Sequence, residues 1–383
     1  MLRSYKTEIN PTEEQKYKIR CTIGVCRYAY NFYLARNQAL YQSGQSFLSA
    51  RAFSVWLNNT YLPSHPEKHW IREVSSKAVK QSIEQGYRAF RNFFKGKSKH
   101  PRFKKKGRSD VKMYFVRNNP GDCLCERHRV KVPTLGWVRL KEKGYLPVTK
   151  SGILIRSGTI SIKAGRYYIS VLAEVPDHPV VRPTGDGLGI DLGLKTFAAC
   201  SDGRMYSNIN RTDRVRKLEK QLRRAQKRLS RKYENKKKGG TAQRNIDRQR
   251  QKVQKLYQRI TNIRQDYQDK VIAGLVKTKP ACITIEDLNI RGMMKNRYLS
   301  KAVASQDFYR FRQRLAEKCR NNGIELRVAD RWYPSSKRCH ACGKVRKDLK
   351  LSDRVFTCSC GYREDRDLNA ALNLRDTLDF VTV

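Results

Sequence analysis

The stretch GLGIDLGLKTFAACSDG, residues 187–203, decides the fold class of the second half of this chain. It predicts a buried strand, a turn and a second strand. Asp191 interrupts the first of these strands, which is otherwise apolar enough to lie in the centre of a sheet. A carboxylate in such a place destabilises the fold unless it is paired or bound to a metal. The stretch therefore predicts a sheet whose central strand carries an acid that needs a partner.

Two further acids occupy comparable places along the chain. Glu286 ends another apolar strand, ACITIEDL, and Asp367 lies in DRDLNAALNL, where alanines and leucines at helical spacing place it early in a helix. A single acid of this kind is more commonly a helix cap or one half of an ion pair. Three of them, on two core strands and a closing helix, could hold two Mg²⁺ ions about 4 Å apart, the arrangement that activates water in phosphodiester cleavage.

Four cysteines close to the third acid predict a metal site of another kind. Cys339 and Cys342 form a C-x-x-C knuckle, CHACG, and Cys358 and Cys360 form a C-x-C knuckle, CSCG. A closed set of four thiolates suits tetrahedral, structural zinc and leaves no open position for catalysis, so His340 is not needed as a ligand. The second knuckle is one residue shorter than the first, so we expect its local geometry to differ. Buried thiols without metal are the alternative.

A second group of cysteines does not predict a metal site. Cys123, Cys125 and His128 in CLCERH lack a fourth ligand at a suitable spacing. We therefore expect them to pack within a strand.

The composition favours a nucleic-acid partner. The chain has 383 residues, 39% of them hydrophobic, which is enough for two or three globular domains. Lys and Arg number 82 against 34 Asp and Glu, so the formal net charge is +48. Such an excess is typical of proteins that neutralise phosphates. No apolar run of about 18 residues and no leader is seen, so we expect a soluble, intracellular protein without a membrane partner.

The most basic segment is predicted to be a long helical hairpin. Between Arg214 and Arg264 there are 20 Lys or Arg and three acids. Apolar residues recur at helical spacing on both sides of a break at Gly239-Gly240: Val215, Leu218, Leu222, Ala225 and Leu229, then Val253, Leu256, Ile260, Ile263 and Tyr267. A charge run is often a solvated face, but one sign dominates here and favours phosphate binding. The basic residues that we expect to contact phosphates include Arg223, Arg224, Lys227 and Arg228.

The first half of the chain predicts a strand, helices and then a small sheet or barrel. Residues 1–10 alternate as a strand does, and Thr12 followed by Gln15 forms a capping box for a helix to about residue 40. A second helix covers about 75–95, followed by an irregular basic flank. Short alternating runs fill 111–175, and the clearest is a hairpin that turns at Ala164-Gly165. Prolines and glycines in 176–187 predict the main domain boundary.

Several of these stretches together resemble a known family. GIDLGLKTFA, ITIEDLNIRGM, the two knuckles and DRDLNAALNL resemble the RuvC-type, RNase H-fold core of the TnpB (OrfB-type) family. TnpB proteins are transposon-encoded RNA-guided nucleases related to the type V CRISPR effectors. The resemblance extends over nearly the whole chain through NFYLARN, HPRFKKKGR, LGWVRL and YPSSKRCHACG.

The resemblance implies a multidomain fold of the α/β plus α+β class. An RNase H-like (RuvC) nuclease domain would span 181–383, with the basic hairpin at about 211–275 and an inserted four-Cys zinc ribbon at about 335–363. A wedge β-barrel would combine 1–10 with 111–180, and a helical recognition domain would fill 11–110. The insertion of the knuckles just before the helix that carries the third acid explains why thiols and carboxylates are neighbours.

The resemblance also implies the activity and its partners. The catalytic, metal-binding triad would be Asp191, Glu286 and Asp367, using two Mg²⁺ or Mn²⁺ ions. The partners would be a transposon-derived guide RNA, with one protein per RNA, and target DNA, in the cytoplasm of a prokaryote at its nucleoid. Guide pairing would read the target, and the protein would read a short motif beside it. Candidate motif-reading residues, by position, are Lys77, Lys80 and Gln81 on the second helix, and Arg117 and Asn118 on the strand after it.

Three other functions are compatible with parts of the pattern. A nuclease-silent, RNA-guided repressor would lack the acids, and all three are present. A strand-transfer transposase would use a similar metal site and would differ in its joined products. A zinc-ribbon RNA-binding protein without activity would not need Asp191 in a core strand.

Overall fold

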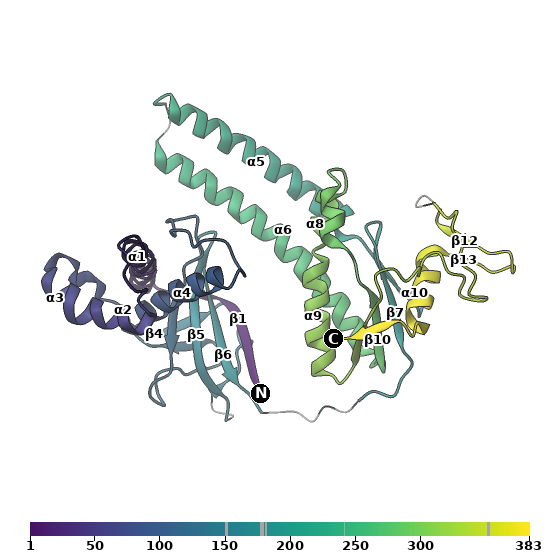
Figure 1. The fold of residues 1–383 in the computed structure, drawn as a ribbon, viewed down its shortest axis with the longest axis horizontal. Helices are drawn as coiled ribbons and strands as arrows, with labels where there is room; N and C mark the ends of the chain where they lie inside the picture. The colour runs from purple at the N-terminus through teal and green to yellow at the C-terminus, as the bar shows by residue number, and fades with distance from the viewer. Residues whose placement is uncertain (150–151, 177–179, 181, 241, 351–352) are drawn as a thin grey trace. The chain divides into compact units, whose positions relative to one another are not determined.

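The computed structural model describes residues 1–383 apart from 150–151, 177–179, 181, 241 and 351–352. It divides into two compact units, residues 1–177 and 178–383. The predicted boundary segment, 176–187, includes 177–179 and 181 and so lies partly outside the described residues. The two units are described separately below, and Figure 1 labels their elements.

The first unit contains a six-stranded antiparallel sheet in the order β2-β5-β6-β1-β4-β3. Its strands are β1 Leu2–Asn10, β2 Met113–Val116, β3 Arg129–Val132, β4 Gly136–Leu140, β5 Leu154–Lys163 and β6 Arg166–Glu174. The pairings among the described residues do not join β2 to β3. The predicted closed barrel therefore stays a prediction.

The hairpin of β5 and β6 confirms its prediction from sequence. Lys163 pairs with Arg166 across a two-residue turn, and Ala164 and Gly165 both have positive φ, 53° and 77°. Two positive φ angles are typical of the turn whose twist matches that of the flanking strands. Alternation of buried and exposed residues then carries one face of each strand into the core.

The first helix of the first unit begins where its capping signal predicts. Thr12 accepts a hydrogen bond from the Gln15 backbone N–H, and the Gln15 side chain accepts one from the Thr12 N–H, which completes the capping box of α1. The two long helices, α1 and α4, pack through a core that includes Tyr33, Ile83 and Phe90. The helices are α1 Glu13–Gln42, α2 Ala50–Trp56, η1 Leu57–Tyr61, α3 Leu62–Ser64, η2 Pro66–Ile71 and α4 Ser76–Phe94.

The second unit is built on another six-stranded sheet, in the order β14-β11-β10-β7-β8-β9. β7, β8 and β9 are antiparallel neighbours, β10 and β11 run parallel to β7, and β14 is antiparallel to β11. The strands are β7 Leu188–Leu192, β8 Thr196–Cys200, β9 Met205–Ser207, β10 Cys282–Glu286, β11 Glu325–Ala329 and β14 Phe380–Thr382. The two strands that carry predicted acids, β7 and β10, are therefore neighbours.

Helices cover both faces of this sheet. The side chains of Leu188 and Ile190 share a buried core with α6, Gln243–Lys277, and α9, Phe308–Asn321. Because side chains alternate along a strand, Gly189 and Asp191 face the other side, where α10, Arg366–Asp376, packs against β7, β8 and β10. The alternation thus presents Asp191 to the helix that carries Asp367.

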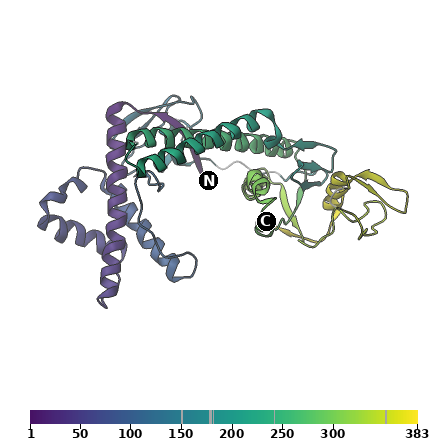
Figure 2. The same cartoon turned by 90° about the horizontal axis from the view of Figure 1, so that it is seen from above.

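The basic segment forms the predicted helical hairpin. α5, Asp213–Lys237, and α6 lie side by side along their length in both views (Figures 1 and 2). The predicted apolar stripes meet in one core, with Val215, Leu222 and Ile260 buried, except that Tyr267 packs against the core of the sheet instead. Gly239-Gly240 lies between the helices, as expected. None of the helices in the described residues is long and apolar enough to cross a membrane.

Shorter elements complete the second unit. They are η4 Ile209–Arg211, α7 Ile290–Lys295, α8 Ser300–Gln306, β12 Val355–Thr357 and β13 Arg363–Asp365. β12 and β13 pair as a two-stranded sheet beside the cysteine knuckles.

Candidate active site and thiol cluster

Strand register brings the first two acids together. Ile285 of β10 pairs with Ile190 of β7 in a parallel ladder, so Glu286 and Asp191 follow at the same end of adjacent strands. Both side chains are half-buried. The sequence predicted one acid on each strand. The register of the two strands shows that these two acids are neighbours.

Asp367 reaches the same place from α10. It is the second residue of that helix, which confirms its predicted position. Asp365 caps the helix, because its carboxylate accepts hydrogen bonds from the N–H groups of Asp367, at 2.9 Å, and Leu368, at 3.1 Å. Sequence reasoning missed this cap, although an Asp directly before a helical pattern is a recognised start signal.

Close backbone contact holds α10 against β7. A Cβ on Gly189 would lie 1.9 Å from the Ala371 carbonyl oxygen and 2.4 Å from the Arg375 backbone nitrogen. Only glycine permits that approach. The position of Asp367 relative to Asp191 therefore depends on a missing side chain two residues before Asp191.

Two of the three carboxyl groups, Asp191 and Glu286, have raised pKa values. Burial raises the pKa of Asp191 well above its usual value, and the nearby carboxylates of Glu286 and Asp367 raise it further. Burial raises the pKa of Glu286 to about 7, although a backbone hydrogen bond from Leu192 acts in the opposite direction. Negative groups brought together out of water are costly, and a bound cation would relieve that cost.

The carboxylates are less tightly gathered than the cysteines. In the described part of the chain, the four thiols are the one group of three or more acid, thiol or imidazole ligands close enough together to hold a single ion. A guanidinium nitrogen of Arg366 lies 3.5 Å from the Asp367 carboxylate. Sequence reasoning did not single out Arg366, and the alternation D-R-D offered no sign of its role.

The predicted cysteines converge as the two knuckles require. Their four sulfur atoms all lie within 4.8 Å of one another, with Cys339 3.7 Å from Cys360 and Cys342 3.6 Å from Cys358. Zn–S bonds of about 2.3 Å in a tetrahedron place sulfur atoms about 3.8 Å apart, so the thiols fit zinc. The backbone N–H of Cys360 chiefly lowers the pKa of Cys358, to about 6. The shorter C-x-C knuckle still completes the set, with Gly361 at φ +88° directly after it.

Buried amides link the thiol cluster to α10. Asn369 donates to the Arg338 carbonyl at 2.8 Å and accepts from the His340 N–H at 3.1 Å. Asn373, one turn later, donates to the carbonyls of Ser335 and Arg338. Both amides are buried, so these bonds fix the first knuckle against the helix that bears Asp367.

The other cysteine group forms no metal cluster among the described residues. Cys123 and Cys125 are buried in the core of the first unit, while His128 is exposed. The expected packing is confirmed, but its expected place is wrong. The three residues lie in the turn before β3, and only Cys125 makes a β-bridge, to Val130.

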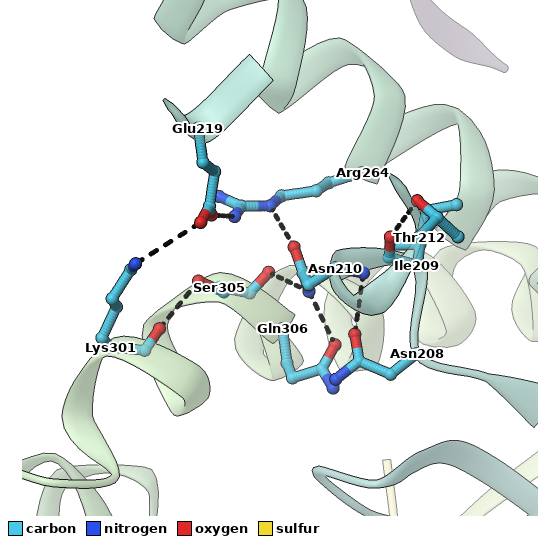
Figure 3. Close-up of polar contacts among 9 residues, drawn as sticks. All are labelled: Asn208, Ile209, Asn210, Thr212, Glu219, Arg264, Lys301, Ser305 and Gln306. Carbon is cyan, nitrogen blue, oxygen red and sulfur yellow. Dashed lines mark hydrogen bonds and ion pairs between the residues drawn. The ribbon is translucent and has the colours of Figure 1, made fainter. Parts of the chain in front are cut away.

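The basic hairpin presents cations and is anchored at its base. Arg223, Arg224, Lys227 and Arg228 are exposed, and none has an acidic partner within the described residues. At the base, Arg264 donates to Asn210 at 2.6 Å and to Glu219 at 3.0 Å, and Glu219 also faces Lys301 of α8 (Figure 3).

Asn210 extends this network to α8. It donates to the Ser305 carbonyl and to the Gln306 side chain, as Figure 3 shows, and Gln306 donates to the Gly193 carbonyl, two residues after Asp191. The hairpin is thus fixed to the strand end that carries the first acid.

Comparisons with known proteins identify the family of this chain. Family models match residues 1–46, described as "Helix-turn-helix domain", 170–297, described as "Probable transposase" of the OrfB type, and 308–374, described as "Cas12f1-like, TNB domain". A "Putative RNA-guided DNA endonuclease" of Streptomyces pristinaespiralis is 34% identical over 97% of this chain and 88% of its own. The "Putative RNA-guided DNA endonuclease InsQ" of Escherichia coli K12 is 30% identical over 97% and 91%.

The chain belongs to the TnpB family. Its fold is similar to that in a cryo-EM structure of the Cas12f1-sgRNA-target DNA complex, with a TM-score of 0.56 at 16% identity over 95% of this chain and 83% of that one. Residues 1–46 of this TnpB chain contain β1 and the single long helix α1.

The candidate motif-reading residues of this TnpB chain lie on neighbouring elements. Lys77 and Lys80 are exposed on α4 and Gln81 is half-buried, and α4 packs against β2. Arg117 and Asn118 follow β2 and do not belong to it, which corrects their expected place on that strand.

Proposed function

We propose that this TnpB chain is an RNA-guided DNA endonuclease whose catalytic acids are Asp191, Glu286 and Asp367. The observation that carries the proposal is their convergence from two strands and a helix at one end of the sheet. The names of the relatives given above support the same activity. We further assign the second unit to the RNase H-like (RuvC) fold and the first to a wedge with an inserted helical recognition domain, with support from the motif resemblance and the fold of Cas12f1.

The acids would hold two Mg²⁺ or Mn²⁺ ions. Bound there, the ions would activate water and stabilise the leaving oxygen of the cut phosphodiester. The chain's own contribution is to keep three anionic oxygen donors close together and partly shielded from water, as hard divalent cations prefer. The guanidinium of Arg366, 3.5 Å from the Asp367 carboxylate, would help to hold that side chain in place. The four cysteines would hold a structural Zn²⁺.

The basic hairpin would bind the transposon-derived guide RNA or its duplex with target DNA, one protein to each RNA. Its surface offers many cations but few exposed aromatic rings, only Tyr233 and Tyr257 within the described residues of the hairpin. Such a surface contacts phosphates and not bases. Guide pairing would select the target, and residues on α4 and after β2 would read a short motif beside it.

The decisive experiment begins with the RNA that co-purifies with the protein. We expect one reproducible species, and a guide changed at its variable end should redirect cutting to the matching DNA next to a fixed motif. Glu286→Gln, which keeps the side-chain shape and removes the charge, should abolish cutting and keep RNA and DNA binding. Absence of a reproducible RNA would overturn the guided function, and joined DNA ends would indicate strand transfer.

A second experiment tests the hairpin. Neutralising Arg223, Arg224, Lys227 and Arg228 together should weaken RNA binding equally for every guide sequence. It should also reduce the slope of log affinity against log salt by up to about three units, since each lost phosphate contact removes roughly 0.7 to 0.9. Replacing Gln221 and Gln226 by Ala is the uncharged control. An unchanged slope in the fourfold variant would mean that these charges only face solvent.

A further inference from the structure

We propose that the cleft beside Asp287, with Trp332 at its rim, is a binding subsite for one unpaired nucleotide of the DNA substrate. The inference rests on the proposed function and deepens it, because it names a second place where the substrate strand is held. The observations that carry it are the position of the cleft, one exposed indole and a set of fixed guanidinium groups.

The cleft adjoins the end of the strand that carries Glu286, although none of the three candidate acids lines it. Its volume is about 950 Å³, and it is lined by Asp287, which follows Glu286, and by Ala329, which pairs with Glu286 across β10 and β11. Both parallel strands end at this edge. Ligands of α/β sheets bind outside the carboxyl ends of parallel strands, so the cleft occupies the usual place for a ligand.

Trp332 is the most exposed large ring in this part of the chain. Its relative exposure is 86%, and it sits on the turn after β11. The turn itself is fixed: the Asp330 carboxylate accepts from the Trp332 N–H at 2.8 Å, and the Tyr333 hydroxyl donates to the Asn373 carbonyl at 3.1 Å. The backbone that carries the indole is thus held in place, and the exposed indole offers an apolar face on which a base can stack.

Arginines line the same cleft. Arg312 lies 2.9 Å from the Asp287 carboxylate, and Arg331 is ion-paired with that carboxylate as well. One acid thus orients two guanidiniums and leaves one positive charge in excess. Arg338 also lines the cleft and has no acidic partner within the described residues.

The charges that line the cleft favour a single unpaired nucleotide over a duplex as its ligand. Asp330 and Asp379 line the cleft too, so its cations are offset and a phosphate-rich duplex would find no strongly positive surface there. An indole can stack only on a base that is free of its own neighbours. A single unpaired nucleotide, with its base on Trp332 and an adjoining phosphate near Arg331 or Arg338, fits both features.

Tryptophan fluorescence tests the proposal without any cleavage. Trp332 is one of four tryptophans, and the other three, Trp56, Trp70 and Trp137, are half-buried in the first unit. In the RNA-loaded Glu286→Gln protein, single-stranded oligothymidylate should quench emission, and Trp332→Phe should remove that quenching. Trp332→Ala should weaken binding of the single strand about 10-fold, and Trp332→Phe less, as expected for one stacked base.

Controls separate this subsite from general binding to a basic protein. Tyr41→Ala removes another exposed ring, 76% exposed on α1, and should leave the affinity unchanged. A duplex of the same length should quench little. Equal affinity of Trp332→Ala and the parent, or equal quenching by duplex, would overturn the subsite. Failure of guided cutting in the wild-type protein would overturn the proposed function instead, and the fluorescence result would not depend on it.

Discussion

The thiol cluster and the carboxylate cluster stand next to each other in the fold but are assembled in different ways. Each thiol pair lies within one tight knuckle, and hydrogen bonds inside the knuckle, such as Gly343 N–H to the Cys339 carbonyl, shape it locally. The carboxylates come from two strands and a helix that are far apart in the chain. Local sequence therefore builds the first site, whereas register and packing build the second.

Because the two sites are assembled differently, substitutions in them should affect the fold differently. Removing one thiol should disturb the fold around it, because structural metal binding is coupled to folding. Removing one carboxylate should relieve repulsion among half-buried anions and leave the fold intact. The following predictions test that contrast, from the largest expected effect to the smallest.

The largest expected effect comes from comparing a substitution in the carboxylate cluster with one in the thiol cluster. Asp367→Ala should reduce guided cutting by a factor of about 1,000 or more with unchanged zinc content and little change in thermal stability, because on the proposed function the acid holds catalytic ions and its one ion pair, with the neighbouring Arg366, is long at 3.5 Å. Cys358→Ser should lower zinc content, thermal stability and cutting together. Metal analysis, thermal melts and cutting rates on both proteins measure the contrast. Full zinc occupancy in Cys358→Ser would show that the ligands were chosen wrongly.

Gly189→Ala tests the packing that builds the carboxylate site. The added methyl would meet the backbone of α10, so the helix must shift, at a cost of about 1–3 kcal/mol or more in the free energy of unfolding. The cutting rate should fall even under conditions in which the variant is still fully folded, since Asp367 moves with the helix. Gly240→Ala, where the new methyl makes only an ordinary 3.6 Å contact, is the control. Wild-type cutting by Gly189→Ala would mean that the site tolerates displacement of α10.

The pH dependence of stability is expected to be similar in free energy to the loss caused by Gly189→Ala, and it needs no substitution. Glu286 has a pKa of about 7 in the folded protein against 4.5 for an ordinary glutamate, so the folded state keeps its proton to higher pH. Without divalent cations, the free energy of unfolding should therefore fall by up to about 3 kcal/mol as pH rises from about 4.5 to 7. Asp191 contributes in the same direction.

Chemical denaturation across pH 5–8 measures this loss. Mg²⁺ should restore stability at pH 8, because it binds the ionised carboxylates, and Glu286→Gln should flatten the profile. Glu234→Gln, at an exposed position on α5, should not change it. A flat profile in the wild-type protein would show that Glu286 is better solvated than its surroundings indicate.

Local signals in the sequence were sufficient for much of the fold. The capping box at Thr12 placed the start of α1, the turn at Ala164-Gly165 placed the β5–β6 hairpin, and the two apolar stripes placed α5 against α6. In each case neighbouring residues determine the structure through short-range hydrogen bonds or side-chain spacing. The knuckle spacing likewise identified the four cysteines that converge.

Contacts between distant segments could not be predicted in the same way. Gly189 was visible as a glycine in a strand, but nothing local indicates that α10 lies on it. Asp287 follows Glu286 directly, yet it is ion-paired with Arg312 and Arg331 from two other elements. Such pairings depend on where the chain returns after long connections, which spacing alone does not encode.

The packing of α10 against β7 also determines when, during synthesis of the chain, the three acids can come together. β7 is the first strand of its unit to leave the ribosome, and α10 follows every other strand and helix of the sheet except β14. A nascent chain consequently carries Asp191 and Glu286 without the third acid from the synthesis of residue 286 until that of residue 367. Because domains fold as they emerge, the chain passes through a long stage that is folded in part and unable to cut. On the proposed function, a chain released before α10 would lack Asp367 and would be unable to cut.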